Sequence, residues 1–351
     1  MTFKRLSEKY ICAAAGAFLI AALTGCGQSG ENTSKAMQLI QALDYQSALA
    51  ELDKAEENGE NDRLIQRARG IAYMGLTDYG SAIEAFEAAL AGSRGMIQDV
   101  DFDLNYYLAA AYTKSMEYTK AEEIYDAVLA LRPEAEDAYF LRGNVRMHLG
   151  NYNDAIKDFE KVIEMDPKNY DRLIEIYQVL DYYNCGNIGQ EYLRAALTSD
   201  DKQMDKYDSG RIYYYLGEYQ DAYLALEEAK EQGSAESCLY LGRAYEATGD
   251  YNYAANVYNS YLSREEGTAE MYNQLGLCQI QRGQYDKALE AFQTGMKMED
   301  ASLTQTLSFN EVVAYEYLGE YEQARELLGN YLKNYPDDRN AEREYEFLST
   351  R

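Results

Sequence analysis

Residues 241–258 read LGRAYEATGDYNYAANVY, and this stretch decides the fold. Gly249 stands two positions before Tyr251, and Ala254 and Tyr258 follow that tyrosine three and seven positions later. Glycine favours the end of a helix, and residues spaced by three, four and seven share one helical face. The stretch therefore predicts two amphipathic helices joined by a tight turn.

The same spacing recurs along the chain. The steps between successive Tyr-x-x-Ala motifs are 34, 39, 34, 67, 32, 34 and 36 residues, and the step of 67 holds two periods with a degenerate unit between them. A period of this length indicates a repeat architecture. The tyrosines are Tyr45, Tyr79, Tyr118, Tyr152, Tyr219, Tyr251, Tyr285 and Tyr321. The large apolar residues seven positions later are Leu52, Phe86, Tyr125, Phe159, Leu226, Tyr258, Phe292 and Leu328.

Glycines and prolines keep the same phase. A glycine two positions before the tyrosine ends the first helix of a pair, and all three prolines lie fifteen residues after a tyrosine, where they end the second helix. We expect the second helix to open at the alanine. A further set of glycines, at a fixed distance before five tyrosines, marks close approaches between helices: Gly70, Gly143, Gly210, Gly242 and Gly276.

In these elements, LGRAY at residues 241–245, GDYNYA at residues 249–254 and then Tyr258, the chain resembles the tetratricopeptide repeat. The resemblance covers about residues 34–338 in nine units. It implies an all-α fold, a right-handed superhelical solenoid of about nine helix-turn-helix repeats, with the array at 35–338. Residues 339–351 are expected to form a capping helix, because the end of such a stack would otherwise expose an apolar face.

One unit departs from the pattern. Residues 170–201 replace the Gly-x-Tyr turn with Tyr183, Asn184, Cys185 and Gly186, and Gly189 stands where alanine is expected. We expect a bend or an altered stacking of helices there.

The N-terminus has the order of a secretory signal. Basic residues are followed by 13 mostly apolar residues, 11–23, whereas a membrane-spanning helix needs about 20. Residues 23–26, LTGC, resemble the bacterial lipobox, which implies removal of residues 1–25 and acylation of Cys26 with diacylglycerol. Residues 26–34 are then the lipid attachment site and a flexible spacer. An uncleaved signal anchor is the alternative.

Charge and composition exclude several functions. With 60 acidic and 33 basic residues, the formal net charge of −27 opposes nucleic-acid binding, which depends on Lys and Arg. No phosphate-binding loop, nucleophile elbow or Cys/His cluster is present, so we expect no catalysis, no cofactor and no metal. His148 is the only histidine. Asp99, Asp101 and Asp103 lack the glycine and glutamate of a calcium loop and suit the start of a helix.

Three cysteines remain once Cys12 and Cys26 are set aside. An odd number allows no complete disulfide framework, and Cys185, Cys238 and Cys278 are each expected to be small helix residues. A Cys238–Cys278 bridge is left open.

The resemblance also implies which residues line the inner groove of the array. The positions directly after the first-helix glycine, and one turn from it, belong to first helices and favour peptide binding through aromatic, amide and guanidinium groups. These candidates are Tyr106, Phe140, Asn144, Tyr207, Arg211, Tyr214, Leu239, Arg243 and Asn273. Arg211 and Arg243 either form a cationic stripe for an acidic segment or a C-terminal carboxylate, or pair with acids of their own stack.

The sequence thus predicts a scaffold, lipid-anchored to the extracytoplasmic side of a bacterial membrane, that binds proteins or peptides in its groove. Two alternatives remain open. One is an assembly or pilot lipoprotein of an outer-membrane, pilus or secretion machine, and the other is an accessory subunit of a cell-wall or polysaccharide system.

Overall fold

The computed structural model describes residues 30–93, 97–198, 204–230, 234–265, 267–298 and 300–351. This part of the chain contains nineteen helices and no strand. The helices are α2 (Glu31–Gln41), α3 (Tyr45–Glu57), α4 (Asp62–Gly75), α5 (Tyr79–Ala91), α6 (Asp99–Lys114), α7 (Tyr118–Leu131), α8 (Glu136–Leu149), α9 (Tyr152–Met165), α10 (Tyr170–Tyr182), α11 (Gly186–Thr198), α12 (Lys206–Leu216), α13 (Tyr219–Lys230), α14 (Ala235–Ala247), α15 (Tyr251–Leu262), α16 (Ala269–Gln281), α17 (Tyr285–Met296), α18 (Ala301–Leu318), α19 (Tyr321–Asn334) and α20 (Arg339–Leu348). The predicted signal sequence and Cys26 lie outside the described residues.

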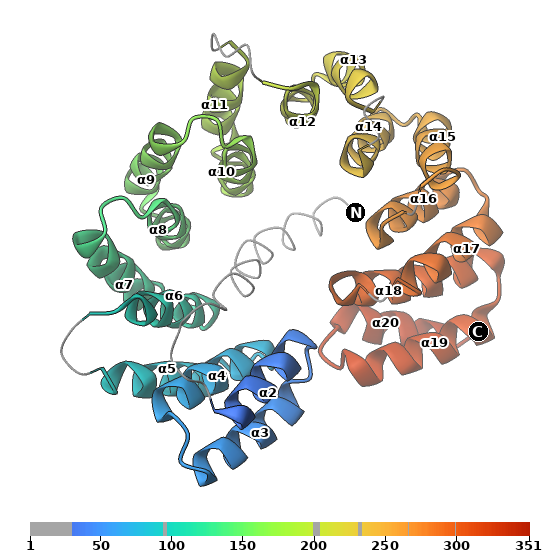
Figure 1. Ribbon diagram of the computed structural model, residues 1–351. Helices are drawn as coiled ribbons and strands as arrows, with labels where there is room; N and C mark the ends of the chain where they lie inside the picture. Colours follow the sequence, from blue (N-terminus) through green and yellow to red (C-terminus); the bar gives the residue numbers. More distant parts are fainter. Residues whose placement is uncertain (1–29, 94–96, 199–203, 231–233, 266, 299) are drawn as a thin grey trace. The chain divides into compact units, whose positions relative to one another are not determined.

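The chain divides into two compact units, one ending at Ala196 and the other beginning at Leu197. Unit 1 holds the helix pairs from α2/α3 to α10/α11, and unit 2 holds those from α12/α13 to α18/α19, with α20 packed on α19. Within each unit, first helices follow one another along one side and second helices along the other (Figure 1). The predicted all-α solenoid of nine helix pairs is confirmed.

Second helices begin one turn earlier than the sequence predicts. They open at the tyrosine of the Tyr-x-x-Ala motif and not at the alanine, as α3 and α5 show. The residue before the tyrosine acts as the N-cap: the side chains of Asp44 and Asp78 accept hydrogen bonds from the amides of Ser47 and Ser81, each at 3.1 Å. A capping carboxylate satisfies an otherwise free amide, so the helix starts there.

The predicted spacer is also shorter than expected. Helix α2 starts at Glu31, so residues 31–34 are helical. The carboxylate of Glu60 accepts hydrogen bonds from the amides of Asn32 and Thr33, each at 2.9 Å. A side chain from the next helix connection therefore caps α2 in place of a residue of its own.

A size match between the two helices of each pair holds the hairpins together. In five pairs, a β-carbon added to the first-helix glycine would overlap the large side chain that follows sixteen residues later in the second helix. Units without that glycine carry Ala36, Ala109 or Val312 at the same position, all fully buried. The glycines and their partners are Gly70 with Phe86, Gly143 with Phe159, Gly210 with Leu226, Gly242 with Tyr258 and Gly276 with Phe292.

The degenerate unit departs from this match. In α10 the small-residue position, sixteen residues before the buried Leu193, is held by Tyr177. A β-carbon on Gly189 of α11 would lie 3.0 Å from the Cα and Cδ2 atoms of Tyr177. Glycine replaces alanine there because Tyr177 adds a second large side chain to the hairpin, beside the buried Leu193. The altered packing expected for this unit is therefore the contact of Tyr177 in α10 with Gly189 in α11.

Replacing Gly276 by alanine tests the size match. Phe292 is fully buried and cannot move aside freely, so Gly276→Ala is expected to lower the free energy of unfolding by about 2 kcal/mol through overpacking. The same substitution at Gly80 of α5 is the control, since its nearest neighbour would be Asp78 Oδ1 at 3.8 Å. Gly80→Ala should stabilise by up to about 1 kcal/mol through helix propensity. Denaturant titration measures the change in the free energy of unfolding for both variants. Changes of the same sign would contradict the size match.

The C-terminal end of unit 2 contains a half-buried carboxylate. The Oε1 atom of Glu316 in α18 is buried and has no hydrogen-bond partner among the described residues. Burial, and then the carboxylate of Glu344 in α20, raise the pKa of Glu316 from an ordinary 4.5 to about 7. Between these two values the folded protein keeps a proton that the unfolded chain releases, so the free energy of unfolding falls as the pH rises.

The variant Glu316→Gln should remove this dependence. Between pH 5 and pH 8 we expect the wild type to lose about 1 kcal/mol more than the variant, after allowance for solvent screening. Glu322→Gln, an exposed site on α19, is the control and should keep the wild-type slope. Parallel pH profiles for wild type and Glu316→Gln in denaturant titrations would contradict this assignment.

Candidate functional site

Side chains of two first helices meet in unit 2 and form what we call the arginine-tyrosine cluster. Helix α12 lies beside α14. Spacings of three and four residues put the side chains of α12 on one helical face, and the same holds for the two residues of α14. The cluster consists of Tyr207, Arg211, Tyr214 and Tyr215 from α12, and Tyr240 and Arg243 from α14.

Tyr240 is the centre of the cluster. Its ring centroid lies 6.0 Å from that of Tyr207, 5.8 Å from Tyr214 and 6.2 Å from Tyr215, with interplanar angles of 74°, 78° and 65°. These are edge-to-face arrangements, which aromatic quadrupoles favour. The hydroxyls of Tyr215 and Tyr240 are 3.3 Å apart. The rings therefore fix one another's orientation.

The two arginines lie over rings and pair with acids. The Cζ atom of Arg211 is 4.3 Å from the ring centroid of Tyr207, and that of Arg243 is 5.3 Å from Tyr240. Arg211 forms an ion pair with Asp208 one turn before it, and Arg243 pairs with Glu270 of α16. The structure thus shows the second alternative, in which both arginines pair within their own stack, and a stripe of uncompensated positive charge is not formed.

The hydroxyls of Tyr214 and Tyr215 keep their protons at neutral pH. Burial is the main cause that raises the pKa of Tyr214 to about 12 and the pKa of Tyr215 above its usual range, and Tyr240 adds to the shift of Tyr215. Arg211 is itself buried and supports the rings, so the arrangement offers half-buried tyrosine rings and hydroxyls and the half-buried guanidinium of Arg243. These suit the recognition of a polypeptide and provide no activated nucleophile.

Two predicted groove residues belong to the core instead. Phe140 is 1% exposed, with its ring 6.1 Å from that of Phe159 and the Arg172 guanidinium 4.2 Å from its centroid. Leu239 is 7% exposed and packs in the core of unit 2. The prediction that they line the groove is wrong, because in α8 and α14 the position one turn before the glycine faces the interior.

The two predicted asparagines bind neighbouring protein groups. Asn144 donates a hydrogen bond from Nδ2 to the carbonyl oxygen of Phe140 in its own helix, at 2.9 Å. Asn273 is buried and accepts one from Nδ2 of Asn310 in α18, at 2.8 Å. Neither joins the cluster.

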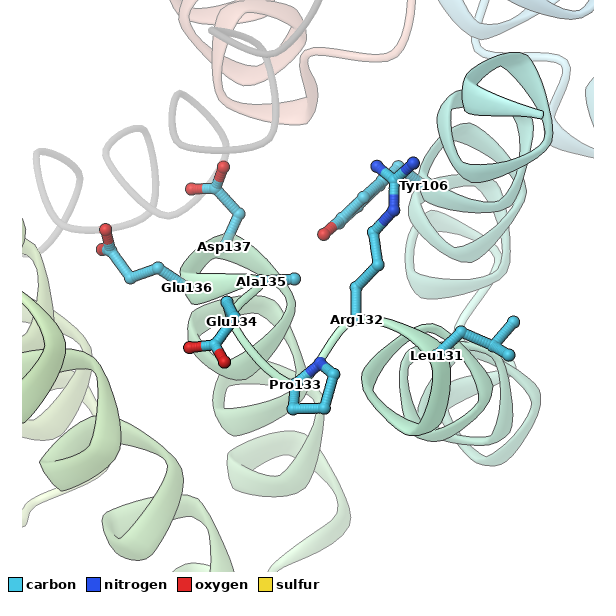
Figure 2. A pocket seen from close by; sticks show the side chains of 8 residues that line it. All are labelled: Tyr106, Leu131, Arg132, Pro133, Glu134, Ala135, Glu136 and Asp137. Atoms are coloured by element: carbon cyan, nitrogen blue, oxygen red, sulfur yellow. The ribbon is translucent and has the colours of Figure 1, made fainter. Parts of the chain in front are cut away.

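Tyr106 lies apart from the cluster, in unit 1. It lines a cavity of about 730 Å³ between α6 and the connection from α7 to α8. Tyr106 and Arg132 occupy one side of the cavity and Glu136 and Asp137 the other (Figure 2). Burial, and then Asp137, raise the pKa of Tyr106 to about 12. Both acids are already paired with Arg172, at 3.1 and 2.7 Å.

Sequence reasoning therefore located four members of the cluster and missed Tyr215 and Tyr240. Tyr240 stands three residues before Arg243, and Tyr215 four residues after Arg211. These are the spacings that place side chains on one helical face, so the signal for both was present.

Other sequence expectations concern metals, thiols and membranes. Asp101 and Asp103 lie at the start of α6 and pair with Arg63 and Arg67. Within the described ranges, no group of three or more His, Cys, Asp or Glu residues is placed to hold a metal ion. Cys185, Cys238 and Cys278 have free thiols, so the Cys238–Cys278 bridge is not formed. No helix in the described part of the chain has the length and apolarity to cross a membrane.

Family models described as "Tetratricopeptide repeat" match residues 34–97, 67–135, 136–169, 239–297 and 309–338, which together make up more than half of the chain.

Among curated proteins, RNA polymerase II-associated protein 3 of Xenopus laevis is 25% identical over 236 residues, which is 58% of this chain and 35% of that protein. The Mus musculus protein of the same name is 28% identical over 155 residues, 39% of this chain and 23% of that one. The match thus spans about a third or less of the length of these relatives.

Among solved structures, a tetratricopeptide repeat protein from Parabacteroides merdae has 14% identity and a TM-score of 0.44, covering 70% of this chain and 97% of its own. MamA from Desulfovibrio magneticus has 20% identity and a TM-score of 0.40, covering 50% and 98%.

Proposed function

Because this chain belongs to the tetratricopeptide repeat family, we propose that it is a scaffold that binds segments of other proteins, tethered by lipid to the extracytoplasmic side of a bacterial membrane. The arginine-tyrosine cluster is the observation that carries the proposal of binding. It would hold a partner segment and perform no chemistry.

The cluster has the properties of an energetically dominant contact patch. Tyrosine and arginine are the residues that most often contribute large binding energies at protein interfaces. The rings of Tyr207, Tyr214 and Tyr215 are held by Tyr240, so little side-chain entropy is lost on binding. Protonated hydroxyls can donate to the backbone carbonyls of an extended partner, which would give affinity without requiring a particular partner sequence.

The tether is proposed on the sequence of the N-terminus and on charge. A net charge of −27 disfavours attachment to anionic lipid through basic residues, whereas an acyl chain contributes about 0.8 kcal/mol per buried methylene whatever the charge of the protein. Helix α2 begins five residues after Cys26, so a lipid on that cysteine would keep unit 1 near the membrane.

The association with RNA polymerase II in the name of the curated relatives is not part of the proposal. The match to the Xenopus laevis protein covers 35% of its length. A net charge of −27 also disfavours a place on nucleic acid.

The variant Tyr240→Ala tests the binding site. Proteins that crosslink to the wild type in envelope preparations of the source organism should be captured at least about tenfold less by this variant, as expected for a central aromatic contact. Leu224→Ala, an exposed site on α13, is the control and should capture as the wild type does. Thermal unfolding of each variant shows whether unit 2 remains folded. Equal capture by a folded Tyr240→Ala would exclude the cluster as the binding site.

The variant Cys26→Ser tests the tether. In a bacterial host, the wild type should sediment with membranes and have the mass of a chain that starts at Cys26 and carries diacylglycerol, whereas Cys26→Ser should lose that mass. Cys185→Ser is the matched control and should be acylated normally. A wild-type chain that keeps residues 1–25 would instead indicate a signal anchor.

A further inference from the structure

We propose that a second surface of unit 2, the tyrosine stack formed by Tyr223 of α13, Tyr245 of α14 and Tyr253 of α15, is a docking platform for an arginine side chain in a basic segment of a partner protein. The proposal goes beyond the binding function assigned to the arginine-tyrosine cluster, with which the stack shares no residue.

The three rings form a near-parallel ladder. The ring centroid of Tyr245 lies 4.4 Å from that of Tyr223 and 5.4 Å from that of Tyr253, with interplanar angles of 14° and 22°. The hydroxyl of Tyr223 is 2.7 Å from Oγ1 of Thr248, which fixes the inner end of the ladder. Tyr253 at the outer end is 62% exposed. A flat ring is therefore presented to solvent with Tyr245 supporting it from behind.

Two carboxylates lie beside rings of the ladder in the sequence of their helices. Glu227 follows Tyr223 by four residues in α13, and Asp250 precedes Tyr253 by three at the start of α15, spacings that put side chains on one helical face. After burial, both are among the groups that raise the pKa of Tyr245. Asp250 is the N-cap residue of α15, yet its side chain makes no capping hydrogen bond. Glu227 forms an ion pair with Lys230. The negative charge offered to a partner therefore comes from Asp250 and from the chain as a whole, whose net charge is −27.

This protein repeatedly places guanidinium groups over aromatic rings. The Cζ atom of Arg211 lies 4.3 Å from the centroid of Tyr207, and that of Arg172 lies 4.2 Å from the centroid of Phe140. Among the residues that the structure describes, no cation lies over a ring of the tyrosine stack. The contact that the chain makes internally elsewhere is available here to a partner.

Arginine fits this surface better than other groups. A guanidinium stacks on an aromatic face and at the same time donates to carboxylates, whereas an ammonium is more strongly hydrated and does not stack. An acidic segment would be repelled by Asp250 and by the net charge of the chain. A neutral sugar could stack on Tyr253 but would gain nothing from the net charge, which steers basic partners toward the protein.

The test uses the full-length protein and three fluorescent probe peptides that have two arginines, two lysines or two citrullines at the same positions between glycines. Anisotropy titration at low salt should give binding of the arginine peptide at least about tenfold tighter than of the citrulline peptide. Tyr253→Leu, which keeps apolar area but removes the ring, should weaken arginine-peptide binding about three- to fivefold. Tyr253→Phe should stay within about twofold of the wild type, because the ring face remains.

Matched controls separate the stack from general charge attraction and from the cluster. Leu224→Ala, also exposed on α13, should bind the arginine peptide as the wild type does. Tyr240→Ala should likewise leave the affinity for the arginine peptide unchanged, because Tyr240 belongs to the arginine-tyrosine cluster and not to the stack. A failure of the proposed binding function can therefore be told apart from a failure of this inference. The proposal would be overturned if Tyr253→Leu bound the arginine peptide as tightly as the wild type does. It would also be overturned if the lysine peptide bound as tightly as the arginine peptide and its affinity were the same for the wild type and Tyr253→Leu. Tyr253-dependent binding of a neutral oligosaccharide without arginine-peptide binding would overturn it too.

Discussion

The fit of a large second-helix side chain against a small first-helix residue is the constraint on which this structure depends. It brings the two helices of each pair close enough to exclude water, and the side chains involved, such as Phe86, Phe159 and Tyr258, are among the largest that are fully buried. Close packing of this kind is sensitive to a single methylene group. The row of first helices follows from hairpins that are closed in this way.

The distribution of charge follows from the same arrangement. Arginines lie where helices meet and are matched there by acids: Arg142 and Arg146 both bond to the buried Asp158, at distances between 2.6 and 3.0 Å. Arg243 reaches the next pair to meet Glu270. Because these arginines are engaged between helices and acids outnumber basic residues by 60 to 33, acids in excess remain for the outer surface. The protein therefore presents a negative surface interrupted by tyrosine rings, which suits basic or neutral polypeptide partners.

Periodic features were predictable from the sequence, and contacts that depend on side-chain direction were not. The spacing of Tyr251, Ala254 and Tyr258 sufficed for the helix pairs because it reports one helical face. The start of the second helix was misplaced because it depends on a capping residue, such as Asp44, outside the motif. Phe140 was wrongly assigned to the groove, and it lies in the core. Successive residues of a helix point about 100° apart, so an error of one position exchanges groove and core. The pairing of Arg243 with Glu270 crosses 27 residues, which local spacing does not report.

The close contact of Tyr177 with Gly189 bears on how such a chain avoids folding errors. Repeats of similar sequence can mispair during folding, since a helix from one hairpin resembles its counterpart in another. Other second helices carry alanine where α11 has Gly189, and the β-carbon of that alanine would overlap Tyr177 if such a helix paired with α10. A register-shifted intermediate that pairs α10 with another second helix would therefore be destabilised.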